Sequence, residues 1–205
     1  MAKRVVCISR TLGAGGEDVA QRVASDLGFR YIDDEIVLAA ADKAGVSPEE
    51  IAKAEHTQPL VVRIMEALAA APMVSESGYI AATVPVPNVT YSQVIAQVIR
   101  EVAEAGNAVI LAHGASHALS GRTDALRVLI TASPDTRENR LAQGGGLDAA
   151  GARKAVEASD RERAKYLERF YNVRHELPTQ YDLTLNTDAM VVPTAVALIV
   201  AAART

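Results

Sequence analysis

The sequence predicts an α/β fold in which helices cover both faces of a parallel sheet. Strand-like and helical patterns alternate along the 205 residues, which is typical of crossover connections between parallel strands. The strand-like stretches are continuous apolar runs, as expected for strands buried on both faces. A glycine-rich stretch, SRTLGAGGED at residues 9–18, directly follows the first of them. Ligands of such folds bind at the carboxyl ends of the strands, so this stretch marks the candidate site.

Five short strands are expected, each rich in β-branched or other apolar residues. They cover residues 4–9, 29–33, 108–113, 126–132 and 181–186. The first helix follows the glycines and extends from about residue 15 to residue 27, because Val19, Val23 and Leu27 fall on one face at helical spacing. Gly28 is expected to end it.

The other helices are expected at residues 34–71, 91–105 and 190–203, with further helical turns between the fourth and fifth strands. Within residues 34–71 a break is expected, after which a new helix begins with Ser47 as its cap and Pro48 in its first turn. Residues 72–89 contain three prolines without a clean period, which indicates a loop. The apolar run 190–203 is too short to span a bilayer. It is typical of a C-terminal helix on the core, with Pro193 in its first turn.

Composition restricts the class of protein. Hydrophobic residues make up 49% and charged residues 22% of the chain, as in a soluble globular protein of one domain, residues 1–205. A net charge of -4 and the absence of Trp argue against a nucleic-acid partner, and no membrane partner is expected. The one cysteine, Cys7, lies in an apolar run, which fits a buried, inert thiol and a cytoplasmic location. Whether the protein forms a homodimer is left open by the sequence.

The glycine stretch has the features of a phosphate-binding loop. Gly13, Gly15 and Gly16 allow close approach of a ligand, and the unpaired N–H groups that open the next helix attract anions. A plain strand-to-helix turn is the alternative. The loop departs from the pattern GxxxxGK[ST], since Gly16 stands at the lysine position and Glu17 and Asp18 stand where Ser or Thr is expected.

A carboxylate beside a triphosphate repels it unless a metal ion intervenes. Three alternatives follow: a cation such as Arg10 or a later arginine replaces the lysine, Asp18 helps to hold Mg²⁺, or catalysis is lost. The candidate nucleotide-binding residues are therefore Arg10, Gly13, Ala14, Gly15, Gly16, Glu17 and Asp18, with Asp18 also the candidate metal ligand.

Three segments resemble bacterial cytidylate kinases and the cytidylate-kinase-like proteins. ISRTLGAGGEDVAQRVASDLGFRYIDDEIV is similar to the opening of the kinase-like group, which also has Ser-Arg before the glycines and Gly in place of Lys. DALRVLITASPDTRENRL is similar to the strand and lid entry of the cytidylate kinases. DRERAKYLERFYNV followed by YDLTLNTD resembles the stretch from the lid to the last strand. Two departures are Glu17, where a basic residue is frequent, and Ala112-His113-Gly114, where Gly-Arg-Gly is usual.

The resemblance implies a three-layer α/β/α fold of the P-loop kinase type, with a five-stranded parallel sheet and a short helical lid at about residues 137–175. It implies Arg140, Arg161 and Arg163 as lid residues for the phosphates, because a guanidinium pairs with two phosphate oxygens. Interleaved acidic residues favour the plainer alternative of a solvated helix face.

Two further residues are substrate candidates at the edge of the sheet. Asp33 follows the second strand, where the acceptor nucleotide of nucleoside monophosphate kinases lies, and it can accept hydrogen bonds from a base or a sugar. Its alternative is a helix cap. His113 can replace an arginine near the phosphates, or it is a neutral, hydrogen-bonded histidine.

The function that these features indicate is phosphoryl transfer from a nucleoside triphosphate, ATP with Mg²⁺, to a nucleoside monophosphate such as CMP or to another small acceptor. The missing lysine and the acidic loop support a second hypothesis, a regulatory nucleotide-binding domain or pseudokinase. A third hypothesis, an interaction protein without a ligand, requires an occluded glycine loop.

Overall fold

The computed structural model describes residues 2–44, 48, 91–144 and 147–205. The chain forms two compact units, one of Met1–Asp33 with Ile99–Thr205 and one of Asp34–Val98. The second unit contains helix α2 (Asp34–Ala44) and the first residues of α5 (Tyr91–Ala105). The expected continuation of helix to residue 71 and the loop at 72–89 lie outside the described residues. The single domain expected from the sequence stays a prediction.

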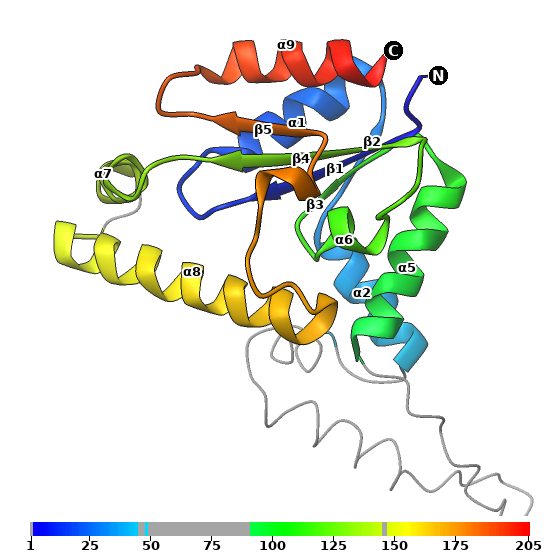
Figure 1. Cartoon of the computed structure of the whole chain (residues 1–205), viewed down its shortest axis with the longest axis horizontal. Coiled ribbons are helices and arrows are strands. Elements are labelled where there is room, and N and C mark those ends of the chain that lie inside the picture. The colour runs from blue at the N-terminus through cyan, green and yellow to red at the C-terminus, as the bar shows by residue number, and fades with distance from the viewer. Residues whose placement is uncertain (1, 45–47, 49–90, 145–146) are drawn as a thin grey trace, which may run out of the picture. The chain divides into compact units, whose positions relative to one another are not determined.

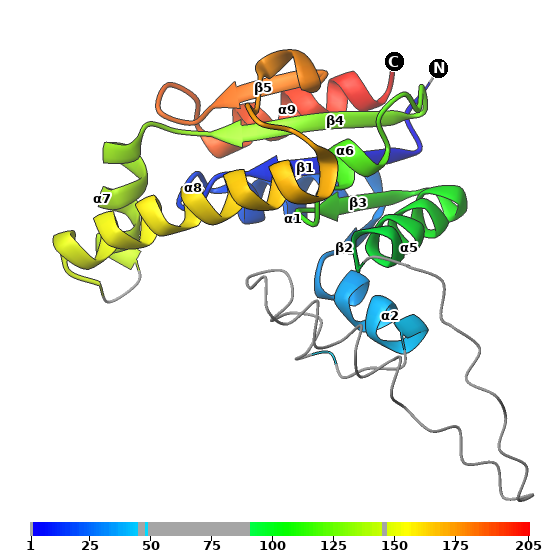
Figure 2. The ribbon, with the colours of Figure 1, turned by 60° about the horizontal axis from the view of Figure 1, so that its bottom comes forward.

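The first unit contains a five-stranded, all-parallel sheet, as predicted. Its strands are β1 (Val5–Arg10), β2 (Arg30–Ile32), β3 (Ala108–Leu111), β4 (Ala125–Thr131) and β5 (Leu183–Asn186). They lie side by side in the order β2-β3-β1-β4-β5, so β1 is the central strand (Figure 2). Neighbours of β1 are strands far away in the sequence, and this crossover order places the residues after β1 at a switch point.

Helices cover both faces of this sheet and confirm the three-layer prediction. The helices α1 (Gly16–Leu27) and α9 (Val192–Ala203) lie together on one face (Figure 1). Val19, Val23 and Ile199 of these helices are completely buried. The other face carries α6 (Ala115–Ala118) and α8 (Ala149–Tyr171), while α7 (Pro134–Gly144) and a 3-10 turn (Pro178–Gln180) complete the connections.

The end of α1 and the start of α9 lie where glycine and proline in the sequence predicted them. Gly28 ends α1 in a left-handed conformation with φ 66°, and Pro193 lies in the first turn of α9. Cys7 is fully buried in β1, as predicted, and burial raises the pKa of its thiol to about 12. That the thiol is inert stays a prediction. None of the described helices combines the length and the apolar composition that a membrane span requires. The cytoplasmic location stays a prediction.

The end of β3 differs from the expectation. The strand was expected to extend through His113, but it ends at Leu111, because Ala112, His113 and Gly114 all have positive φ. This turn lies against the C-terminal end of α8: a Cβ at Gly114 would be 2.6 Å from Cζ of Tyr171, whose hydroxyl donates to the carbonyl of His113. The sequence does not signal such a turn at Ala112, since alanine rarely adopts a positive φ.

Gly114→Ala is expected to destabilise the fold more than Gly121→Ala, a control at φ 85° with open space around its Cα. Both variants strain the backbone by about 1 kcal/mol, but only the first also forces a side chain into a tyrosine ring, which adds about 1–3 kcal/mol. Urea denaturation measures both. The added loss should disappear when Tyr171→Ala is combined with Gly114→Ala. Equal losses at the two glycines would contradict this account.

Candidate functional site

The glycine loop connects the central strand to α1 and has a shape that only glycine permits at two positions. Gly13 has φ 79°, and Gly15, at φ 80°, is the residue before the first turn of α1. Gly13 also lacks room for a side chain, because a Cβ there would be 2.9 Å from the carbonyl oxygen of Arg137 in α7. The loop is fixed at its start by a hydrogen bond from the Thr11 N–H to the carbonyl of Ile130, at 3.1 Å.

A cavity of about 770 Å³ opens over this loop. Its walls are formed by residues 12–15, by Glu17 and Asp18, by Arg140 and Leu141 of α7, and by residues 187–192 after β5. The first N–H groups of α1 have no partner within the helix and carry the positive end of its dipole. The volume is in the range of small-molecule and cofactor sites. The glycine loop is therefore accessible, and the hypothesis of an occluded loop is not supported.

Arg140 is held at the rim of this cavity by main-chain and side-chain acceptors. Its Nη1 donates to Oγ1 of Thr187 at 2.9 Å and to the carbonyl of Gly13 at 3.3 Å, and its Nη2 donates to the carbonyl of Thr187 at 2.7 Å. Thr187 is buried, and its hydroxyl donates to the carbonyl of Ala14 at 2.9 Å. The sequence analysis did not identify Thr187 as a site residue. The one feature that could have indicated it is its position directly after the fifth strand.

Arg163 also reaches the loop, but from α8. Its Nη1 donates to the carbonyl of Arg10 at 3.2 Å, and its Nε and Nη2 donate to the two carboxylate oxygens of Glu176 at 2.8 and 2.5 Å. Burial disfavours the Glu176 carboxylate, but the hydrogen bonds and charge of Arg163 outweigh it, so the pKa of Glu176 is lowered. The hydroxyl of Tyr181 also donates to Glu176. Arg163 thus anchors α8 to the end of β1.

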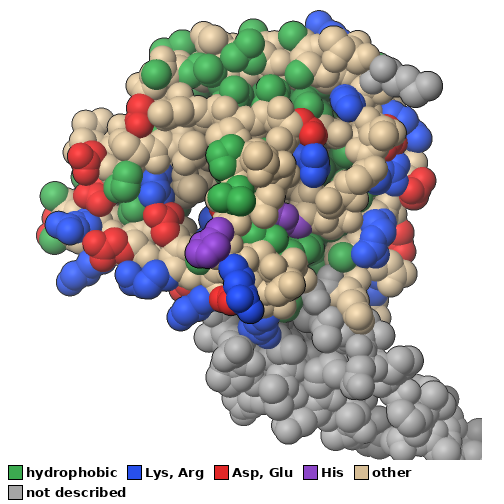
Figure 3. Space-filling model, viewed as in Figure 1, with side chains coloured by type: hydrophobic (Ala, Val, Ile, Leu, Met, Phe, Trp, Pro, Cys, Tyr) green, Lys and Arg blue, Asp and Glu red, His purple; other side chains and the backbone are tan. Residues whose placement is uncertain are grey.

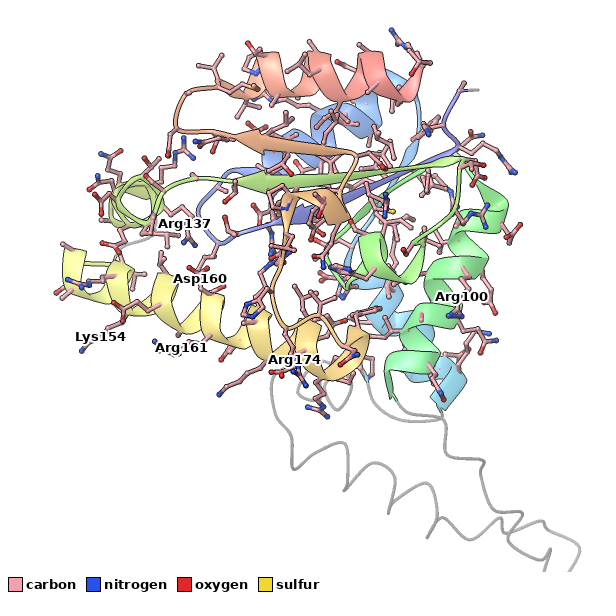
Figure 4. The ribbon with its side chains drawn as sticks, viewed as in Figure 1. Arg100, Arg137, Lys154, Asp160, Arg161 and Arg174 are labelled. Carbon is pink, nitrogen blue, oxygen red and sulfur yellow. The ribbon has the colours of Figure 1, made fainter. Side chains whose placement is uncertain are left out.

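Arg161 lies elsewhere. Figure 4 shows it on the side of α8 opposite to Asp160, which faces Arg137. Its side chain is 65% exposed and its Nη1 is 3.9 Å from Glu157. Charges of both signs are interspersed along this part of α8 (Figure 3), through pairs such as Arg153 with Glu157. In this conformation the plainer alternative, a solvated helix face, describes Arg161.

Arg137 is the arginine that joins α7 to α8. It is 4% exposed, and its Nη1 and Nη2 donate to the carboxylate of Asp160 at 2.8 and 2.6 Å. Its Nη1 also lies 3.4 Å from the carbonyl of Leu12 in the glycine loop. Arg137 and Arg140 are three residues apart and therefore share a face of α7, and both side chains contact the loop.

The acidic residues of the loop are paired with arginines. Arg10 forms an ion pair with Glu17, and Oδ1 of Asp18 is 2.6 Å from Nε of Arg22. The described residues contain no cluster of three potential metal ligands. A polyphosphate can approach the loop at Gly15, which lines the cavity and has nothing within 4 Å of its Cβ position. Mg²⁺ would find one or two carboxylates there and would need phosphate and water oxygens to complete its coordination.

The two substrate candidates lie side by side beyond the carboxyl ends of β2 and β3. Nε2 of His113 is 3.4 Å from Oδ1 of Asp33, and the hydroxyl of Tyr31 donates to Oδ2 at 3.1 Å. The pKa of Asp33 is lowered, chiefly because the imidazole of His113 lies beside its carboxylate. His113 is nearly buried, so the pair forms a fixed polar group at the sheet edge.

Comparison with known proteins gives a family and a fold. A sequence profile described as the Cytidylate kinase-like family matches residues 5–189. No curated protein matches. An uncharacterized protein from Eubacterium ventriosum is similar in structure, with a TM-score of 0.69, 17% identity and 98% of each chain covered. Shikimate kinase from Bacteroides thetaiotaomicron has a TM-score of 0.51 and 16% identity, with 95% of each chain covered. A sugar kinase from Janibacter has a TM-score of 0.51 and 12% identity over 99% of each chain.

Arg163→Ala is expected to lower the free energy of unfolding by about 2–4 kcal/mol, because it leaves a mostly buried carboxylate without its cation. Arg161→Ala is the matched control on the same helix and should leave that free energy unchanged. Guanidinium denaturation at pH 7 measures both. The loss caused by Arg163→Ala should shrink as the pH falls, since protonation of Glu176 removes the charge that needs pairing. Equal stability of the two variants would contradict the anchor role of Arg163.

Proposed function

The chain belongs to the cytidylate kinase-like family, and we propose that it transfers a phosphoryl group from a nucleoside triphosphate to a small acceptor. The observation that carries the proposal is the cavity of about 770 Å³ whose floor is the glycine loop. That loop presents the N-terminus of α1 and has Arg140 fixed at its rim. The match to the family and the P-loop kinase fold support a nucleotide-dependent phosphotransferase in general. ATP with Mg²⁺ and a CMP-like acceptor are the finer parts of the proposal.

Phosphoryl transfer requires positioning and positive charge more than covalent chemistry from the protein. The N–H groups at the start of α1 would bind the phosphates, and Arg140 would approach them from the rim of the cavity. Bound Mg²⁺ would neutralise phosphate charge, and Asp18 is the residue we propose for it, in exchange for its ion pair with Arg22. The apolar part of the cavity wall, including Met190 and Val192, would cover the nucleoside.

The acceptor would lie near Asp33 and His113. The Asp33 carboxylate is held in place by His113 and Tyr31, and its lowered pKa keeps it ionised at neutral pH. An ionised carboxylate accepts hydrogen bonds, so it suits a hydroxyl group or the amino group of a base such as cytosine. This arrangement favours an acceptor that offers hydrogen-bond donors at the end distant from the reacting oxygen.

A regulatory nucleotide-binding domain without turnover is the second candidate. Two observations favour it: Gly16 occupies the lysine position, and the arginines of α7 and α8 are engaged by carboxylates, Arg137 by Asp160 and Arg163 by Glu176. Such pairs would have to open before either guanidinium could contact a phosphate. Both candidates require nucleotide binding, and only the first requires an acceptor.

ATP with Mg²⁺ is expected to raise the melting temperature of the protein, because a ligand that binds only the folded state stabilises it by mass action. A ligand at 100 times its Kd contributes about 2.7 kcal/mol. Gly15→Val should abolish the shift, since its side chain would project from a residue at φ 80° on the wall of the cavity. Differential scanning fluorimetry with ATP, ADP and the other nucleotides measures this. No shift with any nucleotide at millimolar concentration would refute both candidates.

Turnover separates the two candidates. Release of ADP from ATP should increase when CMP or another acceptor is added, and Arg140→Ala should reduce that rate by about tenfold or more, the usual cost of losing a charge-assisted phosphate contact. Arg140→Lys should restore little of the rate, because an ammonium group cannot replace the parallel N–H donors of the planar guanidinium. A parent that binds ATP tightly and consumes none with any acceptor would be the regulatory domain.

Asp18→Asn should weaken the binding of ATP in Mg²⁺ more than in EDTA, because only the metal-bound form needs the carboxylate. The exposed Asp26 of the same helix supplies the control, Asp26→Asn, which should change neither affinity. Titration calorimetry in the two buffers gives the four affinities. If Asp18→Asn strengthens binding equally in both, the carboxylate acts only by repelling phosphate.

A further inference from the structure

Gly16 is a glycine because another residue occupies the space of its side chain. A Cβ placed on Gly16 would lie 2.5 Å from Cβ and 3.0 Å from Cγ of Arg10, closer than real Cβ atoms approach such neighbours. Gly15, one residue earlier, has the opposite reason: its φ is 80° and nothing lies within 4 Å of its Cβ position. The aliphatic part of Arg10 therefore crosses the point from which a lysine side chain at position 16 would start.

The two residues also have related positions in the loop pattern. When Gly13-Ala14-Gly15 is aligned with the end of GxxxxG, Arg10 stands at the first glycine of the pattern and Gly16 stands at the lysine. A glycine and a long cationic side chain have thus exchanged places, and the two positions touch in space. We propose that Arg10 supplies the cation that the missing lysine would have supplied to the phosphates, and that Gly16 is required to admit it. This inference rests on the proposed function.

The backbone of Arg10 is firmly placed for such a role. Arg10 is the last residue of the central strand, where it pairs with Ile130 of β4, and its carbonyl accepts a hydrogen bond from Arg163. Its side chain is about one-third exposed, and its Nε is buried with Glu17 as its ionic partner. Glu17 lines the cavity over the glycine loop, so the ionic partner of the Arg10 guanidinium belongs to the wall of that cavity.

The charge of Arg10 acts on both sides of the candidate reaction. On one side it lies against Gly16 and Glu17 at the start of α1. On the other it contributes to the lowered pKa of Asp33, after the larger effects of the neighbouring His113 and Tyr31 side chains. A cation between the phosphate loop and the acceptor edge is placed where negative charge moves during phosphoryl transfer.

Glu17 has a defined part in this arrangement. Its carboxylate forms an ion pair with Arg10 in the structure. Phosphate oxygens would have to replace this carboxylate as the partner of Arg10. The other arginines that contact the loop have different partners. Arg137 is held by Asp160 and Arg163 by Glu176, which do not line the cavity, and Arg140 is held by uncharged oxygens of Thr187 and Gly13. Among the described arginines that contact the loop, Arg10 is the one whose acidic partner belongs to the cavity wall; Asp18, another acidic residue of that wall, pairs with Arg22 of α1.

Binding of tripolyphosphate and of ATP with Mg²⁺ tests the cation. Arg10→Met keeps the aliphatic part of the side chain and removes its charge, so affinity for both probes should fall about tenfold or more. Arg10→Lys should lose less. Glu17→Gln should raise the affinity for tripolyphosphate severalfold by freeing Arg10. Arg100→Ala, on the exposed side of α5, is the control and should match the parent. Calorimetry gives all affinities without reference to turnover.

A reciprocal exchange tests the packing. Gly16→Lys alone should reduce stability and binding, because its side chain collides with Arg10. Arg10→Gly alone should lose affinity about tenfold. The double variant Arg10→Gly with Gly16→Lys removes the collision and returns a cation, so its affinity should come within about threefold of the parent, less than half of the 1.4 kcal/mol that corresponds to a factor of ten.

The outcomes separate this inference from the proposed function. If the parent binds ATP and Arg10→Met binds it equally well, Arg10 is not the cation and only this inference fails. If the parent binds neither probe, the proposed function fails, and the ligand part of the inference fails with it. The packing part has its own readout: Gly16→Ala should destabilise the parent and be tolerated beside Arg10→Gly. Equal losses in both backgrounds would overturn it.

Discussion

The backbone between Arg10 and Gly16 is packed so closely on two sides that side chains are not accommodated at Gly13 or Gly16. On one side the main chain of Arg137 approaches Gly13, and on the other the side chain of Arg10 covers Gly16. The remaining features of the site depend on this contact. Because α7 touches the loop directly, Arg140 can reach the carbonyl of Gly13, and the segment after β5 can bond to Ala14 through Thr187.

Arginine–carboxylate pairs hold the elements around that loop. Arg137 with Asp160 joins α7 to α8, and Arg163 with Glu176 joins α8 to the segment that leads to β5. Both arginines also contact carbonyl oxygens of residues in or next to the loop, Leu12 and Arg10. Partly buried pairs of this kind gain little net stability over apolar contacts, but they are costly to break singly. They therefore set the arrangement of the helices more than they raise stability, and a phosphate that competes for either arginine would alter that arrangement.

Local patterns were sufficient for the five strands, apart from the end of β3, for the helices α1, α5 and α9, and for the position of the glycine loop. Apolar runs placed the five strands, helical spacing placed α1, and glycine and proline placed its end and the start of α9. The site was only partly predictable, because charge patterns do not tell which face of a helix meets the loop. Arg140 and Arg163 contact the loop and its flank, whereas Arg161 faces solvent two residues from Arg163. The contact of Arg10 with Gly16 and the hydrogen bonds of Thr187 arise from three-dimensional packing. The periodicity of apolar residues along the sequence carries no information about such contacts.

The bond from Thr187 to Ala14 joins residues 173 positions apart, and it has a consequence for biosynthesis. The central strand, made first, has neighbours that begin at residues 108 and 125. During translation its apolar residues therefore remain unpaired until β3 and β4 have been synthesised. This state favours association with other chains or with chaperones. Contacts of such long sequence separation also slow folding. The cavity cannot close before residues 187–192 have left the ribosome, so nascent chains that end earlier would lack the site altogether.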